Sequence, residues 1–67
     1  MKVKVNGAWT ALSEAAPSVA SLIERMALGG KRIAVELNGQ IVPRSRYAQT
    51  FLGAGDRIEI VGAVGGG

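Results

Sequence analysis

Few residues of this chain could do chemistry by themselves. The 67-residue sequence contains no cysteine and no histidine, so it lacks both a thiolate nucleophile and the side chain that most often acts as a general base near neutral pH. Its five acidic residues are scattered singly, which is typical of solvated faces and indicates neither a paired-carboxylate site nor a metal site. We therefore expect a protein that is not an enzyme and that binds no metal.

The most unusual chemical group is the carboxylate that follows the last segment, Ala63-Val64-Gly65-Gly66-Gly67. Glycine loses more backbone entropy on ordering than any other residue, so this run does nothing for folding. One interpretation is a frayed or artificial end. The other is that the carboxylate, ionised at pH 7, is threaded through a narrow channel to attack the α-phosphate of ATP, with residues 63–67 reaching about 16 Å when extended.

The net charge and the aromatic residues limit the classes of partner that the protein could bind. Eight basic and five acidic residues give a net charge of +3, which suits an acidic protein surface or a nucleic acid as well as simple solubility. Trp9, Tyr47 and Phe51 could stack on bases, but packing in or around a small core explains them equally simply. No apolar run approaches a membrane span, and we expect a cytoplasmic protein without membrane or nucleic-acid partners.

Two Asn-Gly pairs, at residues 6–7 and 38–39, predict tight β-hairpins because both turn positions need positive φ. Alternating apolar and polar residues on either side indicate strands with one buried face. The predicted strands cover residues 2–5, 8–12, 32–37 and 40–42. A last strand is predicted over 57–61, with Ile58 and Ile60 on one face, after a polar crossover at 44–50 that holds one helical turn at 45–48.

One amphipathic helix is predicted between the hairpins, over residues 18–28. Its apolar residues, from Val19 to Met26, follow the spacing i, i+3, i+4 and i+7. Ser18 can cap its N-terminus, and Gly29-Gly30 supplies the left-handed residue that ends helices.

This order of elements predicts an α+β fold. The single helix must join a parallel pair of strands and cover one face of the sheet. The first and last strands then become central neighbours in a five-stranded mixed sheet, the ubiquitin-like β-grasp arrangement; a small α+β sandwich of other connectivity is the alternative. Residues 1–62 would form this domain, and residues 63–67 a flexible glycine tail.

Over essentially its whole length the sequence resembles the ThiS family, the β-grasp sulfur carriers of thiamine (thiazole) biosynthesis. The most specific parts are Asn38-Gly39, the stretch Ile41-Val42-Pro43-Arg44, Gly55-Asp56 before the last strand, and the terminal Gly66-Gly67. The resemblance implies a protein cosubstrate with no permanently bound cofactor. A ThiF-type, E1-like enzyme would adenylylate its terminal carboxylate with ATP and magnesium, a cysteine desulfurase relay would supply sulfur, and a ThiG-type thiazole synthase would accept it.

The resemblance also implies roles for individual residues. Gly67 would bear the adenylate and then the thiocarboxylate, and Gly66 would give clearance in the partner's channel. Val64 would continue into a partner groove, and from their position and hydrophobicity we expect Ile58 and Ile60 to help in docking. Gly65 has two interpretations: it lengthens the arm, or the mature end lies one residue earlier.

Three other functions compete with a thiazole carrier. A molybdopterin-synthase small subunit would use the same thiocarboxylate with another acceptor. A ubiquitin-like modifier would normally carry a basic residue where Val64 precedes the glycines. A non-catalytic basic β-grasp binding module would use the basic residues Lys31, Arg32, Arg44 and Arg46 and would have an inert tail.

Overall fold

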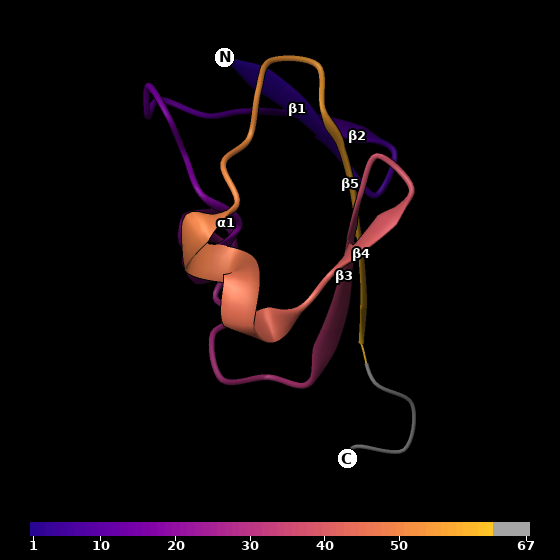
Figure 1. Cartoon of the computed structure of the whole chain (residues 1–67). Coiled ribbons are helices and arrows are strands. Elements are labelled where there is room, and N and C mark those ends of the chain that lie inside the picture. The colour runs from indigo at the N-terminus through magenta and orange to yellow at the C-terminus, as the bar shows by residue number, and fades with distance from the viewer. Residues whose placement is uncertain (63–67) are drawn as a thin grey trace.

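The computed structural model describes residues 1–62, and residues 63–67 lie outside the described part. The described chain folds into a sheet with one short α-helix and one 3-10 helix on the same face (Figure 1). Its elements are β1 (Lys2–Val5), β2 (Ala8–Ala11), α1 (Val19–Arg25), β3 (Ile33–Leu37), β4 (Gln40–Val42), η1 (Arg44–Gln49) and β5 (Arg57–Gly62).

The five strands form one mixed sheet in the order β2-β1-β5-β3-β4. β1 and β5 are parallel, with Val5 opposite Ile58, whereas β3 is antiparallel to both β4 and β5. The predicted β-grasp arrangement is therefore confirmed, including the parallel pairing of the first and last strands at the centre of the sheet.

The Asn-Gly turns close both hairpins with positive φ angles, 49° and 82° at Asn6 and Gly7, and 51° and 87° at Asn38 and Gly39. The two asparagine side chains also reach the central strand. Asn6 Oδ1 accepts a hydrogen bond from the Ile60 N–H at 2.7 Å, and Asn6 Nδ2 donates to the Ile60 carbonyl at 3.1 Å. Asn6 thus extends the pairing of β5 beyond the end of β1.

Asn38 holds the other side of β5 in a similar way. Its Oδ1 accepts from the Arg57 N–H at 2.9 Å, and its backbone N–H donates to the Arg57 carbonyl at 2.8 Å. Asn38 Nδ2 also donates to Asp56 Oδ1 at 3.2 Å. Each hairpin turn therefore fixes the register of the last strand through an amide side chain, in addition to turning the chain.

α1 begins as predicted but ends earlier. Ser18 Oγ accepts from the Ser21 N–H at 3.0 Å and caps the first turn. At the other end the Ala27 N–H donates to the Glu24 carbonyl, and the Leu28 N–H donates to the Ile23 carbonyl, the two bonds of a Schellman motif. The predicted stop at Gly29-Gly30 is wrong, because Ala27 takes the left-handed conformation, with φ 59°, and Leu28 folds back against the core.

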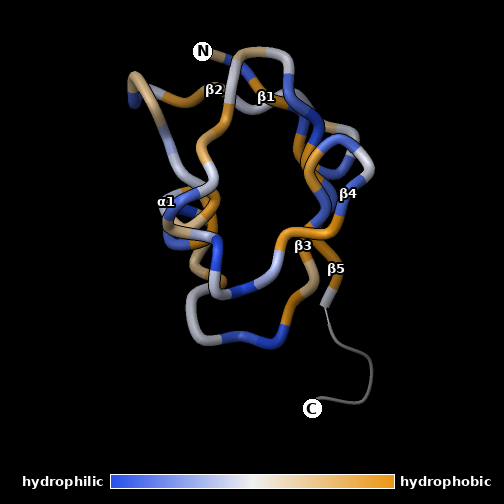
Figure 2. Tube along the Cα trace, viewed as in Figure 1, coloured by the Kyte–Doolittle hydropathy of each residue, from blue (hydrophilic) through white to orange (hydrophobic). Residues whose placement is uncertain are grey.

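The core lies between the sheet and the two helices, and hydropathy alternates along the strands that face it (Figure 2). Of the three aromatic residues only Tyr47, in η1, is buried. Trp9 and Phe51 are 60% and 61% exposed, so core packing does not explain them. The buried core residues are Val3, Val5, Leu12, Val19, Leu22, Ile23, Val35, Val42, Tyr47, Leu52, Ile58 and Ile60.

We predict that Asn6→Gly lowers the free energy of unfolding by about 1 to 3 kcal/mol, because glycine keeps the positive φ but leaves both polar groups of Ile60 without their side-chain partners. Urea unfolding measures the change. Gln40→Ala, which removes an exposed amide in β4 without such bonds, is the control and should change stability by less than about 0.5 kcal/mol. Equal stabilities of Asn6→Gly and the wild type would contradict the role of this side chain.

Candidate functional site

The predicted reactive segment follows directly from the central strand. The ladder between β3 and β5 runs to Gly62, which lies opposite Ile33, so the described chain ends at the end of the sheet where β3 begins (Figure 1). Val64, Gly65, Gly66 and Gly67 lie outside the described residues, and their roles stay predictions. The structure fixes their starting point, at the end of the strand that is held on both sides.

The predicted docking role of Ile58 and Ile60 is wrong. Their side chains are 1% and 9% exposed and belong to the core. The alternation along β5 turns them toward α1, so a partner could reach them only if the domain opened. Residues of β5 that a partner can touch are the alternate ones, Arg57, Glu59 and Val61, which are all exposed.

We call the sheet surface that faces away from α1 the outer face. It carries three large exposed apolar side chains on three different strands: Trp9, Ile41 and Val61, with exposed fractions of 60%, 65% and 59%. Of these three residues, only Val61 could have been recognised from the sequence as an exposed apolar residue. It stands at a position of β5 where the alternation calls for a polar residue, in the hydrophobic end of that strand (Figure 2). By strand register the outer face consists of Lys2, Lys4, Trp9, Ala11, Ala34, Glu36, Ile41, Arg57, Glu59 and Val61.

On the outer face, residues of the same charge lie opposite each other on neighbouring strands. Lys4 of β1 lies opposite Arg57 of β5, and Glu36 of β3 lies opposite Glu59 of β5. Like charges directly opposite each other across two strands destabilise a sheet. The Lys4 Nζ is partly compensated, since it lies over the Trp9 ring, 5.5 Å from the ring centroid.

The charge of the outer face therefore changes sign along β5. One end presents cations beside an indole, and the other presents two carboxylates beside Ile41 and Val61. This arrangement does not favour stability, but it is suited to a partner that brings opposite charges and apolar side chains to the same surface.

The described residues offer little other chemistry. Within residues 1–62 no group of three or more acidic, histidine or cysteine side chains is placed to hold a metal ion. In the same part of the chain, no helix is both long enough and apolar enough to cross a membrane.

Comparison with protein families gives one clear match. The sequence model of the ThiS family matches residues 3–67 of the chain. The match covers the whole described domain from Val3 onward and continues through the C-terminal glycines.

Two curated relatives align with the full length of the chain. A protein named thiazole synthase, from Paramagnetospirillum magneticum, is 40% identical over 67 residues, and the chain spans only 20% of that protein's length. The uncharacterized protein ycf40 of Porphyra purpurea is 30% identical over 67 residues, which make up 93% of its length.

Two solved structures of a thiamine biosynthesis protein (ThiS) from Geobacter metallireducens share the fold. The crystal structure has a TM-score of 0.86 and 29% sequence identity, with 100% of both chains covered. The solution structure has a TM-score of 0.80 and the same identity, and covers 100% of this chain and 88% of that one.

We predict that Glu36→Lys raises the free energy of unfolding by up to about 1 kcal/mol, because the new ammonium group faces the Glu59 carboxylate in place of a second carboxylate. Thermal and urea unfolding at low salt would measure the gain, which should shrink at 1 M salt, where the Debye length is about 3 Å. Glu14→Lys, an exposed residue before α1, changes the net charge equally and is the control. A gain of the same size in Glu14→Lys would assign the effect to net charge.

Proposed function

The chain belongs to the ThiS family, the sulfur carriers of thiamine biosynthesis, and we propose that it carries its sulfur as a thiocarboxylate on Gly67. The observation that carries this proposal is the extent of the family match, which runs through the domain and on to Gly67. The sequence supports it as well: without cysteine, the chain has no thiol on which to hold sulfur, and a terminal carboxylate is the group left for the task.

The proposed chemistry has two steps. An oxygen of the Gly67 carboxylate attacks the α-phosphate of ATP, and pyrophosphate leaves. The product is a mixed anhydride with AMP, which has a good leaving group, whereas a free carboxylate is a poor acyl electrophile. A hydrosulfide equivalent then attacks the acyl carbon and AMP leaves, so that one carboxylate oxygen departs with AMP and sulfur takes its place.

The partners must supply everything except the carboxylate. We assign the first step to a ThiF-type, E1-like adenylyltransferase, which would bind ATP and magnesium, and the sulfur to a relay that begins with cysteine desulfurase. Glycine at positions 65–67 suits a narrow channel, because no Cβ keeps the channel walls or the nucleotide away from the backbone.

A ThiG-type thiazole synthase is the proposed acceptor of the sulfur. It is supported by the relative from Paramagnetospirillum magneticum, in which a segment equivalent to this whole chain is part of a polypeptide named thiazole synthase. Because the two parts are covalently linked in that relative, we expect the corresponding parts to work together where they are separate chains.

We further propose that the outer face replaces Ile58 and Ile60 as the docking surface for the activating enzyme. Val61 is central to it, because it is exposed, lies on β5, and precedes the proposed reactive tail by only a few residues. An enzyme that holds the tail in a channel would thereby cover Val61 as well.

We predict that the purified chain, incubated with its activating enzyme, ATP, magnesium and a sulfur source, gains the mass of one sulfur-for-oxygen exchange. Intact-protein mass spectrometry followed by fragmentation should locate the change at Gly67. A variant without Gly66 and Gly67 should keep the fold, judged by its NMR spectrum, and should gain no sulfur. An unmodified wild-type chain, with an activating enzyme shown to be competent on another carrier, would refute the proposal.

We also predict that Val61→Lys slows formation of the thiocarboxylate roughly tenfold, the effect of losing about 1.4 kcal/mol of docking free energy, while leaving the stability of the domain within about 0.5 kcal/mol. The control is Phe51→Lys, since Phe51 is equally exposed but lies on the connection between η1 and β5, off the outer face. Rates measured at subsaturating carrier report the difference. Equal rates for both variants would show that the outer face is not used.

A further inference from the structure

A small hollow of about 160 Å³ lies on the helix side of the sheet, between α1, the connection that follows it, the start of β3 and η1. Its apolar lining includes Ile23, Leu28, Ile33 and Tyr47, and its charged lining residues are Glu24, Lys31 and Arg44. Neither the proposed sulfur chemistry nor the outer face involves this hollow.

The shape of the hollow follows from the way α1 ends. The Schellman motif turns Leu28 back toward Ile23, with the Leu28 N–H bonded to the Ile23 carbonyl at 2.9 Å. Gly29 then leaves room for the acidic residue of the hollow, because a Cβ built there would lie 3.2 Å from both carboxylate oxygens of Glu24. The unexpected helix end therefore builds one wall of the hollow.

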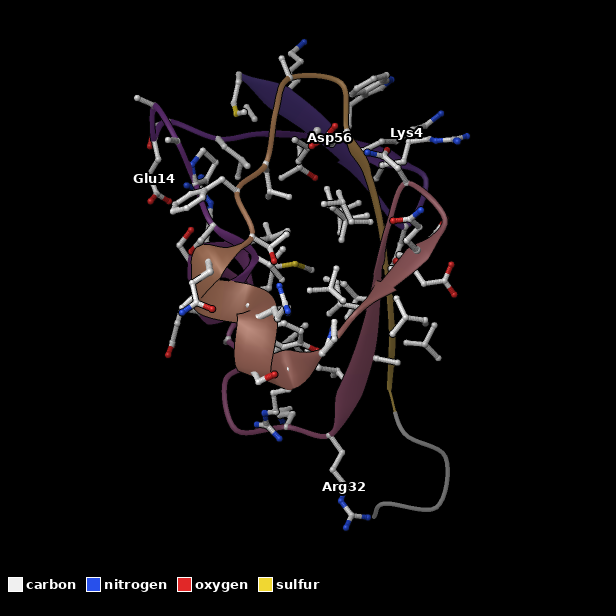
Figure 3. The ribbon with its side chains drawn as sticks, in the orientation of Figure 1. Lys4, Glu14, Arg32 and Asp56 are labelled. Atoms are coloured by element: carbon white, nitrogen blue, oxygen red, sulfur yellow. The ribbon has the colours of Figure 1, made fainter. Side chains whose placement is uncertain are left out.

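The charges around the hollow favour an anion. Two cationic residues, Lys31 and Arg44, share the lining with one carboxylate, and neither cation takes part in the side-chain hydrogen bonds found within residues 1–62. Arg32, their neighbour in sequence, does not line the hollow and extends away from the domain (Figure 3). A ligand that combined an apolar group with a carboxylate would meet both kinds of lining.

The size of the hollow favours a protein side chain as the occupant. Sites for cofactors and drug-sized ligands usually measure about 300 to 1,000 Å³, so this one is too small for them. Its volume is close to that of a cavity of about 150 Å³ that holds one benzene molecule. A hollow of this kind suits a single anchor residue of a protein partner.

The hollow lies where a partner that binds the C-terminal segment could fill it. Ile33 lines the hollow and lies opposite Gly62 in the β3–β5 ladder, so the hollow is found at the end of the domain where β5 ends (Figure 1). A protein that binds the C-terminal segment from the helix side would reach it.

We propose that this hollow is an anchor site for the thiazole synthase, which inserts an apolar side chain next to a carboxylate of its own between Lys31 and Arg44. The inference rests on the proposed function for the identity of the partner, which is supported by the relative in which a segment equivalent to this chain is part of a polypeptide named thiazole synthase. The chemistry of the occupant comes from the hollow itself.

The first test compares two arginines of η1 that differ in position only. Arg44 lines the hollow and Arg46 does not. Titration calorimetry of the unmodified, full-length chain with the thiazole synthase should show at least about tenfold weaker binding for Arg44→Glu, and less than about twofold for Arg46→Glu. Ala20→Leu, which fills the hollow from α1, should weaken binding similarly. Equal losses for the two arginine variants, or a loss only toward the activating enzyme, would overturn the assignment.

The second test does not depend on any partner. 4-Methylpentanoate should shift the methyl NMR signals of Ile23, Leu28 and Ile33 with a Kd on the order of 1 to 10 mM, and the neutral 4-methylpentanamide should bind several-fold more weakly. Ala20→Leu should abolish the shifts. If neither compound shifts these methyl groups, or if both bind equally, the anchor site is wrong; if the carboxylate binds there but no sulfur is ever loaded on Gly67, the failure lies with the proposed function.

Discussion

The fold depends on the placement of β5 between β1 and β3. This strand is the last one in residues 1–62, yet it is the central strand of the sheet, parallel to one neighbour and antiparallel to the other. Its pairings join residues far apart in the chain, so the entropy of closing long loops must be offset by well-defined contacts. The two asparagines of the hairpin turns supply such contacts, because each bonds to the backbone of β5 from a different side.

The two faces of β5 have different roles, one in stability and the other in recognition. Its inward residues, Ile58 and Ile60, complete the core under α1, whereas its outward residues belong to a surface on which like charges face each other. A sheet selected for stability alone would alternate these charges. The cost is tolerable because the inner face holds the domain together, which leaves the outer face free to match a partner.

Local sequence signals predicted most of the fold but only part of the candidate site. Both Asn-Gly turns, the strand alternation and the Ser18 cap act within a few residues, and the structure confirms them. The end of α1 was missed because Ala27 becomes left-handed only when Leu28 can pack on the core, a contact made in the folded domain. Ile58 and Ile60 were misassigned because their hydrophobicity was interpreted as a docking signal although their alternation places them inside; the exposed apolar Val61 was the better signal.

A carrier that loads sulfur at one enzyme and delivers it at another must be bound by both in turn, and each must hold the same C-terminal segment. The outer face and the hollow lie on opposite sides of the sheet; the outer face includes Val61 near the end of β5, and the hollow includes Ile33, which lies opposite Gly62. If the activating enzyme uses the first and the thiazole synthase the second, then each enzyme can select the carrier by a different surface. Substitutions in one surface would then affect loading without affecting delivery, which a shared docking surface would not allow.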